Sequence, residues 1–181
     1  MRSKSNEDYL KAIYLIQEQQ NGQPVSTSSL ASRLGVANAS VTGMVKRFAA
    51  EDPKLVEYEP YSGVTLTNAG EKMALEVIRH HRLLESYLSQ MLGYSWDEVH
   101  EEAERLEHVI SEEMEERLAI ALGDPVTDPH GDPIPDREGK FHQPEYQSLT
   151  DIPDGQHAEI RRVVRQEPDL LRYLAELGLV L

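Results

Sequence analysis

The sequence predicts a mainly α-helical protein in three parts, and three observations support this prediction. Amphipathic helical patterns cover most of residues 7–122, and short alternating segments at 55–58 and 64–66 fit a β-hairpin. A segment rich in Pro, Gly and Asp follows at 123–143, before a short apolar C-terminal part. We therefore expect a winged helix-turn-helix at 1–72, a helical dimerisation domain at 73–143, and the linker end with an incomplete β domain at 144–181.

The winged domain begins with three predicted helices, at Glu7–Gln20, Thr27–Leu34 and Asn38–Ala50. Asn6 or Ser5 is a suitable N-cap for the first helix and Ser26 for the second, while Gly35 supplies the turn into the third. A helix, a glycine turn and a second helix form the helix-turn-helix pattern, whose later helix enters the DNA major groove.

The third helix presents small and basic residues on its polar side, namely Ala39, Ser40, Thr42, Gly43, Lys46 and Arg47. Small residues let the helix lie deep in the groove, where hydroxyls reach base edges and basic side chains reach phosphates. Leu55–Tyr58 and Val64–Leu66 alternate around Pro60–Gly63 and predict a hairpin wing. The alternative is a helical interaction domain without DNA, and the wing favours DNA binding.

Two longer helices are predicted next. The first covers Thr67–Leu92. The second extends from Trp96 to Leu122, because Ser95 and Glu98 form a capping box and neither Gly nor Pro interrupts the stretch. Their apolar stripes are wider than one small domain needs, which favours a homodimer interface over packing within one chain.

Histidine and acidic residues share faces of these helices. His100, Glu104, Glu107 and His108 follow at i, i+4, i+7 and i+8, and His81 and Glu85 at i, i+4. Together with Asp8 on the first helix they suit a divalent metal, since imidazole and carboxylate bind Mn(II) and Fe(II). The alternative is an acidic solvent-facing surface. His80 is rotated about 100° from His81, and we expect it on the surface.

The composition of the chain favours a cation-binding protein and excludes thiolate metal sites and membrane-spanning segments. The net charge is -14, yet the first 72 residues hold eight basic and eight acidic residues, so the excess lies in the remaining ten basic and 24 acidic. An acidic second half binds cations and makes DNA affinity depend on neutralising them. The absence of cysteine excludes thiolate ligands, and no apolar stretch is long enough for a signal peptide or a membrane span. We therefore expect a cytoplasmic protein with no membrane partner.

The last third of the sequence is irregular at first. His130 and His142 fall in the linker, and we expect both to face solvent. Beyond it, the pattern predicts a strand at Ala158–Val164, a helix at Asp169–Leu177 and a second strand at Leu179–Leu181.

Across essentially its whole length the chain resembles the diphtheria-toxin-repressor and manganese-transport-regulator family of metal-dependent transcriptional repressors. The order and spacing of five stretches together carry this resemblance: Glu7–Tyr14, Ser40–Val45, His81–Glu85, His100–His108 and Gly131–Pro135. The resemblance implies an SH3-like fold for the C-terminal β segment.

The resemblance also implies two metal sites per subunit. The primary site would comprise Asp8, Glu104, Glu107 and His108, and the ancillary site His81, Glu85 and His100. Longer members add ligands from the SH3-like domain, and Glu167 is the residue that aligns there.

Two departures from the family pattern bear on the metal. Iron-responsive members place Met and Cys where this chain has Asp8 and Glu104, and replacing sulfur by carboxylate favours Mn(II), with Fe(II) as the alternative. Short manganese regulators carry a Glu where this chain has Lys11, so we expect two separate sites rather than a closely bridged pair.

The expected function is a Mn(II)-responsive repressor of manganese uptake genes, which binds a palindromic double-stranded operator as a homodimer and has no small-molecule substrate. An Fe(II)-responsive repressor is the alternative within the same class. A carboxylate-bridged di-metal enzyme would need Glu-x-x-His from each of two helices, which neither long helix supplies. A metal-free winged-helix protein that binds a small ligand would leave the His and Glu row unexplained. We expect no enzymatic activity.

Overall fold

The structure is a computed structural model that describes residues 3–142 and 146–181. Their contacts form two compact units, one up to Ile78 and the other from Arg79 onward. The mainly helical fold predicted from the sequence is confirmed. The predicted limit between residues 143 and 144 lies outside the described residues.

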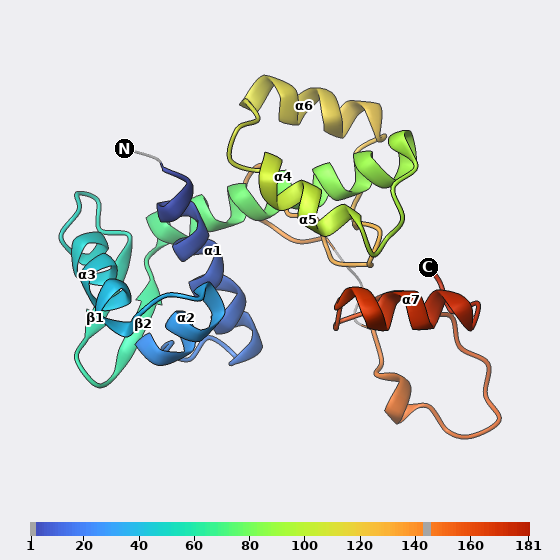
Figure 1. Ribbon diagram of the computed structural model, residues 1–181, viewed down its shortest axis with the longest axis horizontal. Coiled ribbons are helices and arrows are strands. Elements are labelled where there is room, and N and C mark those ends of the chain that lie inside the picture. Colours follow the sequence, from blue (N-terminus) through green and yellow to red (C-terminus); the bar gives the residue numbers. More distant parts are fainter. Residues whose placement is uncertain (1–2, 143–145) are drawn as a thin grey trace. The chain divides into compact units, whose positions relative to one another are not determined.

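The first unit contains the three predicted helices and the wing (Figure 1). They are α1 (Lys4–Gln19), α2 (Thr27–Leu34), α3 (Asn38–Ala49), β1 (Val56–Glu59) and β2 (Gly63–Leu66). α1 begins earlier than predicted because Ser3, rather than Asn6 or Ser5, is its N-cap, and the Ser3 Oγ accepts the Asn6 N–H at 3.3 Å.

Apolar faces of the three helices and the wing pack into one core. Leu10, Leu30 and Phe48 bring α1, α2 and α3 together with no exposed surface. The segment before α2 joins the wing, because Val25 and Val64 exchange two backbone hydrogen bonds of 2.8 and 2.9 Å. The wing and α3 are therefore held on one scaffold, which leaves the polar side of α3 free.

The second unit is built on the long helix α4 (Asn68–Leu92), which begins in the first unit (Figure 1). α5 (Val99–Leu106) and α6 (Glu112–Ala121) follow it. The continuous helix predicted from Trp96 to Leu122 is wrong. The chain leaves helical conformation after Leu106 and restarts at Ser111, whose Oγ accepts the Met114 N–H at 3.2 Å. An N-cap serine followed by an acidic first turn favours a helix start there, even without Gly or Pro.

The C-terminal part is less regular than predicted. A short 3-10 turn, η1 (Leu149–Asp151), and the predicted helix, found as α7 (Pro168–Glu176), are its regular elements among the described residues. The strands predicted at 158–164 and 179–181 are not formed: the first stretch instead contacts the loop that follows α6. None of the described helices combines the length and the apolar character that crossing a membrane requires.

Candidate metal centre

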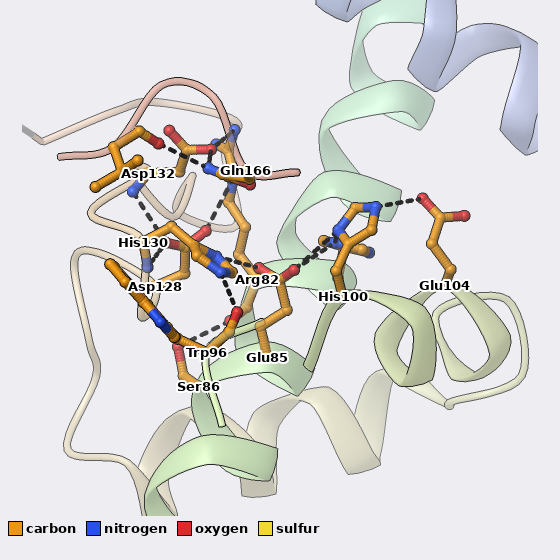
Figure 2. Close-up of polar contacts among 12 residues, drawn as sticks. Arg82, Glu85, Ser86, Trp96, His100, Glu104, Asp128, His130, Asp132 and Gln166 are labelled. Carbon is orange, nitrogen blue, oxygen red and sulfur yellow. Dashed lines mark hydrogen bonds and ion pairs between the residues drawn. The ribbon is translucent and has the colours of Figure 1, made fainter. Parts of the chain in front are cut away.

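His81 and Glu85 lie one turn apart on α4, where the i, i+4 spacing directs both side chains to one face. The His81 Nε2 is 2.9 Å from Glu85 Oε1, and the His100 Nδ1 on α5 is 3.1 Å from both atoms. The spacing on α4 and the packing of α5 beside it therefore bring together the residues predicted for the ancillary site. His100 Nε2 is 3.9 Å from Glu104 Oε1, and Figure 2 shows Glu104 on the side of His100 that is away from Glu85. We call His81, His100 and Glu104 the open group, because His100 and Glu104 are about half exposed.

Glu107 lies just beyond α5 and is almost fully buried. Its carboxylate is 2.5 Å from His81 Nδ1 and 3.1 Å from His108 Nε2. Its backbone is still helical, with its N–H donating to the Ala103 carbonyl oxygen at 2.9 Å, so the i, i+7 spacing keeps Glu107 on the same face as His100 and both contact His81.

His80 is a correction to the sequence prediction, because it is buried rather than on the surface. Its Nδ1 lies 3.0 Å from the Glu107 carbonyl oxygen and its Nε2 lies 3.0 Å from Glu115. Arg79 also donates to Glu115 at 2.6 Å. Burial alone would raise the pKa of Glu115, but these two partners lower it to about 2. His80 therefore fixes α6 and the end of α5 on α4.

The predicted primary site draws on both units. Asp8 lies half-buried on α1 in the first unit, while Glu104, Glu107 and His108 belong to the second. Their assembly around one metal stays a prediction.

A second, closed group consists of Glu85, Asp128 and His130, whose ligand atoms lie within 4.8 Å of one another. The sequence predicted Glu85 as a ligand but missed Asp128 and His130. The expectation that His130 faces solvent is wrong, since it has no exposed surface. Asp128 Oδ1 accepts the His130 N–H at 2.8 Å and the Asp132 N–H at 2.9 Å. This Asx turn bends the Asp128-Pro129-His130-Gly131 loop so that the imidazole points into the unit. His142 is exposed, as predicted.

The two ring nitrogens of His130 have different surroundings. Nε2 lies 2.6 Å from the Trp96 carbonyl oxygen and must donate to it, so a neutral ring carries its lone pair on Nδ1. That Nδ1 is buried without a hydrogen-bond partner and lies 3.7 Å from Glu85 Oε2 (Figure 2). A lone pair facing a carboxylate is unfavourable unless a cation or a proton lies between them. The closed group therefore fits a metal ion.

The charges of the closed group also require compensation. Burial, then Glu85 and Asp132, raise the pKa of Asp128 to about 7. Burial lowers the pKa of His130, but the neighbouring Glu85 outweighs it and raises the pKa above its ordinary value. Burial opposes ionisation of Glu85 too, yet His81, His100 and His130 hold the pKa of its carboxyl well below the usual range. A divalent cation would supply the positive charge that protons supply in its absence.

Glu167 does not join either group. Its side chain is exposed, accepts from Arg165 Nε at 3.2 Å and occupies the N-cap position of α7. The structure therefore does not bring this predicted ligand to His81, Glu85 or His100.

The predicted DNA-contacting residues lie on α3 as expected. Ala39, Ser40, Gly43, Lys46 and Arg47 are exposed. Thr42 is half-buried and donates its hydroxyl to the Asn38 carbonyl at 3.0 Å. Arg47 donates to the Asn6 side chain on α1 and lies over the Phe48 ring at 5.5 Å, so its guanidinium is oriented before any phosphate arrives.

Comparison with known proteins independently supports a DNA-binding first part and a metal-binding second part of the chain. Residues 1–64 match the iron dependent repressor N-terminal DNA binding domain, and residues 67–136 match the iron dependent repressor metal binding and dimerisation domain. Residues 147–181 match the FeoA domain. The iron-dependent repressor IdeR of Mycobacterium leprae is 34% identical over 190 residues, which cover 97% of this chain and 80% of that protein.

Solved structures are also similar over 97% of this chain. A manganese-dependent transcriptional repressor in complex with manganese is 40% identical, with a TM-score of 0.84 and 79% of its own chain covered. ScaR with bound Zn²⁺ is 32% identical, with a TM-score of 0.75 and 80% covered.

Proposed function

The chain belongs to the diphtheria-toxin-repressor and manganese-transport-regulator family of metal-dependent transcriptional repressors, and on that premise we propose that its own effector is Mn(II). It is a DNA-binding repressor and a homodimer, not an enzyme. Its regulated genes would be those for manganese uptake, and it would act in the cytoplasm, where it meets its operator.

The observation that carries this proposal is the chemistry of the donor atoms. The open and closed groups offer only imidazole nitrogen and carboxylate oxygen, and the chain contains no cysteine. Such donors suit Mn(II), whereas thiolate would favour softer metals. The same donors accept Fe(II), which is the second candidate effector because relatives such as IdeR are named iron-dependent repressors.

We assign two metal positions per subunit. The first keeps the predicted primary ligands Asp8, Glu104, Glu107 and His108. For the second, the closed group of Glu85, Asp128 and His130 supplements the predicted ancillary ligands His81 and His100. A bound divalent ion would supply the positive charge that these buried carboxylates need.

Coupling between metal and DNA follows from where the ligands sit along the chain. Asp8 belongs to α1, whose Asn6 holds Arg47 of the DNA-reading helix, whereas Glu107 and His108 belong to the dimerisation unit. Ligands that share one ion restrict how the DNA-reading unit is oriented, and metal and DNA binding then favour each other by linkage. In a homodimer, two oriented α3 helices match the half-sites of a palindromic operator.

The deciding experiment is a DNA-binding titration against Mn(II), Fe(II) under anaerobic conditions, and Zn(II). It uses a promoter fragment of a manganese transporter at one salt concentration, because phosphate contacts make affinity steeply dependent on salt. We expect tight binding at the lowest free concentration of Mn(II). Tighter binding with Fe(II) would establish the iron-responsive alternative, and binding indifferent to metal would refute both.

A pair of histidine variants tests the second position. His130→Ala should shift the Mn(II) dependence of DNA binding to higher concentration, while His142→Ala, an exposed histidine of the same linker, should leave it unchanged. An equal response in the two variants would remove the closed group from the metal-binding residues.

A further inference from the structure

The segment 161–166, which we call the C-terminal clasp, lies against the loop that carries the closed group. The Val163 N–H donates to the His130 carbonyl oxygen at 2.9 Å. Gly131 has a φ of +82°, and a Cβ at this position would lie 2.0 Å from the Arg161 carbonyl oxygen. The close contact therefore requires glycine at 131, for its backbone conformation and for its missing side chain.

Asp132 joins the loop to the C-terminal clasp. Its Oδ1 accepts from Arg162 Nε at 2.6 Å and its Oδ2 accepts from Gln166 Nε2 at 2.9 Å (Figure 2). Its own backbone N–H donates to Asp128 Oδ1. A single residue thus contacts the clasp through its side chain and a proposed metal ligand through its backbone.

The loop is fixed on several sides once the clasp is docked. The His130 ring is stacked on Trp96, with ring planes 18° apart, and its backbone carbonyl is taken by Val163. The buried Arg82 donates to the Pro133 carbonyl and lies 3.9 Å from both Asp128 and Asp132. All of these contacts join protein groups, so they form without metal.

We infer that the C-terminal clasp restrains the loop bearing Asp128 and His130, with Asp132 as the positioning residue, and thereby slows release of a metal from the closed group. The ligand is a divalent cation, and the inference rests on the proposed function for that cation. The docking of the clasp itself needs only the contacts described above. Opening of the loop would require the Val163 and Asp132 bonds to break together, which makes it a local unfolding step.

The first test measures docking in metal-free protein by amide hydrogen exchange. Asp132→Ala should speed exchange of the Val163 amide about tenfold, because the hydrogen bonds from Arg162 and Gln166 to the Asp132 carboxylate are lost. Asp136→Ala is the matched control. Asp136 makes the same kind of turn, accepting from the Glu138 and Lys140 N–H groups, but its contacts are with neither the clasp nor the closed group. Arg162→Ala, which leaves the loop residues unchanged, should give a smaller increase in the exchange rate of the Val163 amide.

The second test measures metal release. Trp96 is the single tryptophan of the chain and stacks on His130, so its fluorescence reports on Mn(II) in the closed group. After the Mn(II)-loaded full chain is mixed with excess chelator, we expect the Trp96 fluorescence to recover about tenfold faster in Asp132→Ala than in Asp136→Ala. Gly131→Ala, which keeps every side chain of the cluster, should behave like Asp132→Ala.

The outcomes separate the inference from the function on which it rests. Faster Val163 exchange with unchanged Mn(II) release would overturn the inference and leave the metal position standing. Failure of Mn(II) to quench Trp96 in the unmodified chain would overturn the metal position and the inference together. Unchanged exchange at Val163 in both Asp132→Ala and Arg162→Ala would overturn the inference, because the clasp would then not be held by Asp132.

Discussion

The two sides of Glu85 differ in their exposure to water. Its Oε1 faces the open group, where His100 is about half exposed, and its Oε2 faces the closed group, where His130 has no exposed surface. The open group consists of helix residues at turn spacing, whereas the closed group adds a loop that is bent by its own hydrogen bonds. Substitutions of the half-exposed His100 and Glu104 should therefore alter metal binding alone, and substitutions on the closed side should alter stability as well.

The largest effect is expected at the residue that both sides share. Glu85→Gln removes the charge that His81, His100 and His130 surround, and Glu85 is only 2% exposed. Breaking a buried ionic cluster costs about 3 kcal/mol, so the free energy of unfolding should fall by about that amount and Mn(II) binding at the second position should weaken. Denaturant unfolding and calorimetric Mn(II) titration check this. A variant as stable as the parent would mean that the charge of Glu85 does not hold the buried cluster together.

Substitutions of His130 and His100 should have smaller effects on the free energy of unfolding, and the two effects should differ. His130→Ala opens a cavity in the closed side and should lower the free energy of unfolding of metal-free protein by about 2 kcal/mol. His100→Ala removes a half-exposed ring and should lower it by less than about 0.5 kcal/mol. Denaturant unfolding of both variants without metal gives the comparison. Equal losses would contradict the distinction between open and closed sides.

The closed side should also make stability depend on pH. Because the pKa of Asp128 is raised in the folded state, the folded protein binds more protons than the unfolded chain between about pH 4 and 7. The raised pKa of His130 acts in the same direction, with stability present at low pH and lost as pH rises through it. Metal-free protein should lose on the order of 1 kcal/mol from pH 5.5 to 7.5, measured by denaturant unfolding.

Asp128→Asn is the control for this pH dependence, since it removes the titrating carboxyl while retaining an oxygen for the turn. Its stability should change less over the same range. A parent protein that becomes more stable as pH rises to 7.5 would contradict the sign.

The smallest change in stability is expected on the open side. Glu104→Cys replaces a half-exposed carboxylate by a softer ligand, so stability should change by less than about 0.5 kcal/mol while the metal preference moves from Mn(II) toward Zn(II). Operator binding titrated with each metal measures this shift. Identical selectivity in parent and variant would exclude Glu104 from the ligands.

The helix faces that carry His81, Glu85 and His100 could be predicted from the sequence and the loop of the closed group could not, for a physical reason. His81, Glu85, His100 and Glu104 lie on helices, where spacing alone fixes the face. Asp128 and His130 lie in a loop whose direction depends on tertiary hydrogen bonds. One signal was present: an Asp two residues before a His, with Pro and Gly around it, is typical of an Asx turn.

The helices and strands were also predicted best where local sequence signals determine them. The helices and wing of the first unit carry strong caps and turns, so their positions were predicted within a few residues. The break between α5 and α6 is marked by neither Gly nor Pro, so the sequence prediction missed it, although Ser111 and the acidic residues after it are typical of a helix start. The strand predicted at 158–164 has a suitable apolar pattern but pairs with no strand among the described residues.

The contact between Glu107 and His81 also bears on how steeply the repressor responds to metal. Glu107 belongs to the first proposed position and His81 to the second, and their side chains lie 2.5 Å apart, so cations at both positions would lie close together and repel each other. Filling one position should therefore weaken the other, which is negative cooperativity, with a Hill coefficient below one. Such a subunit would respond gradually over a wide span of metal concentrations and would not act as an abrupt switch.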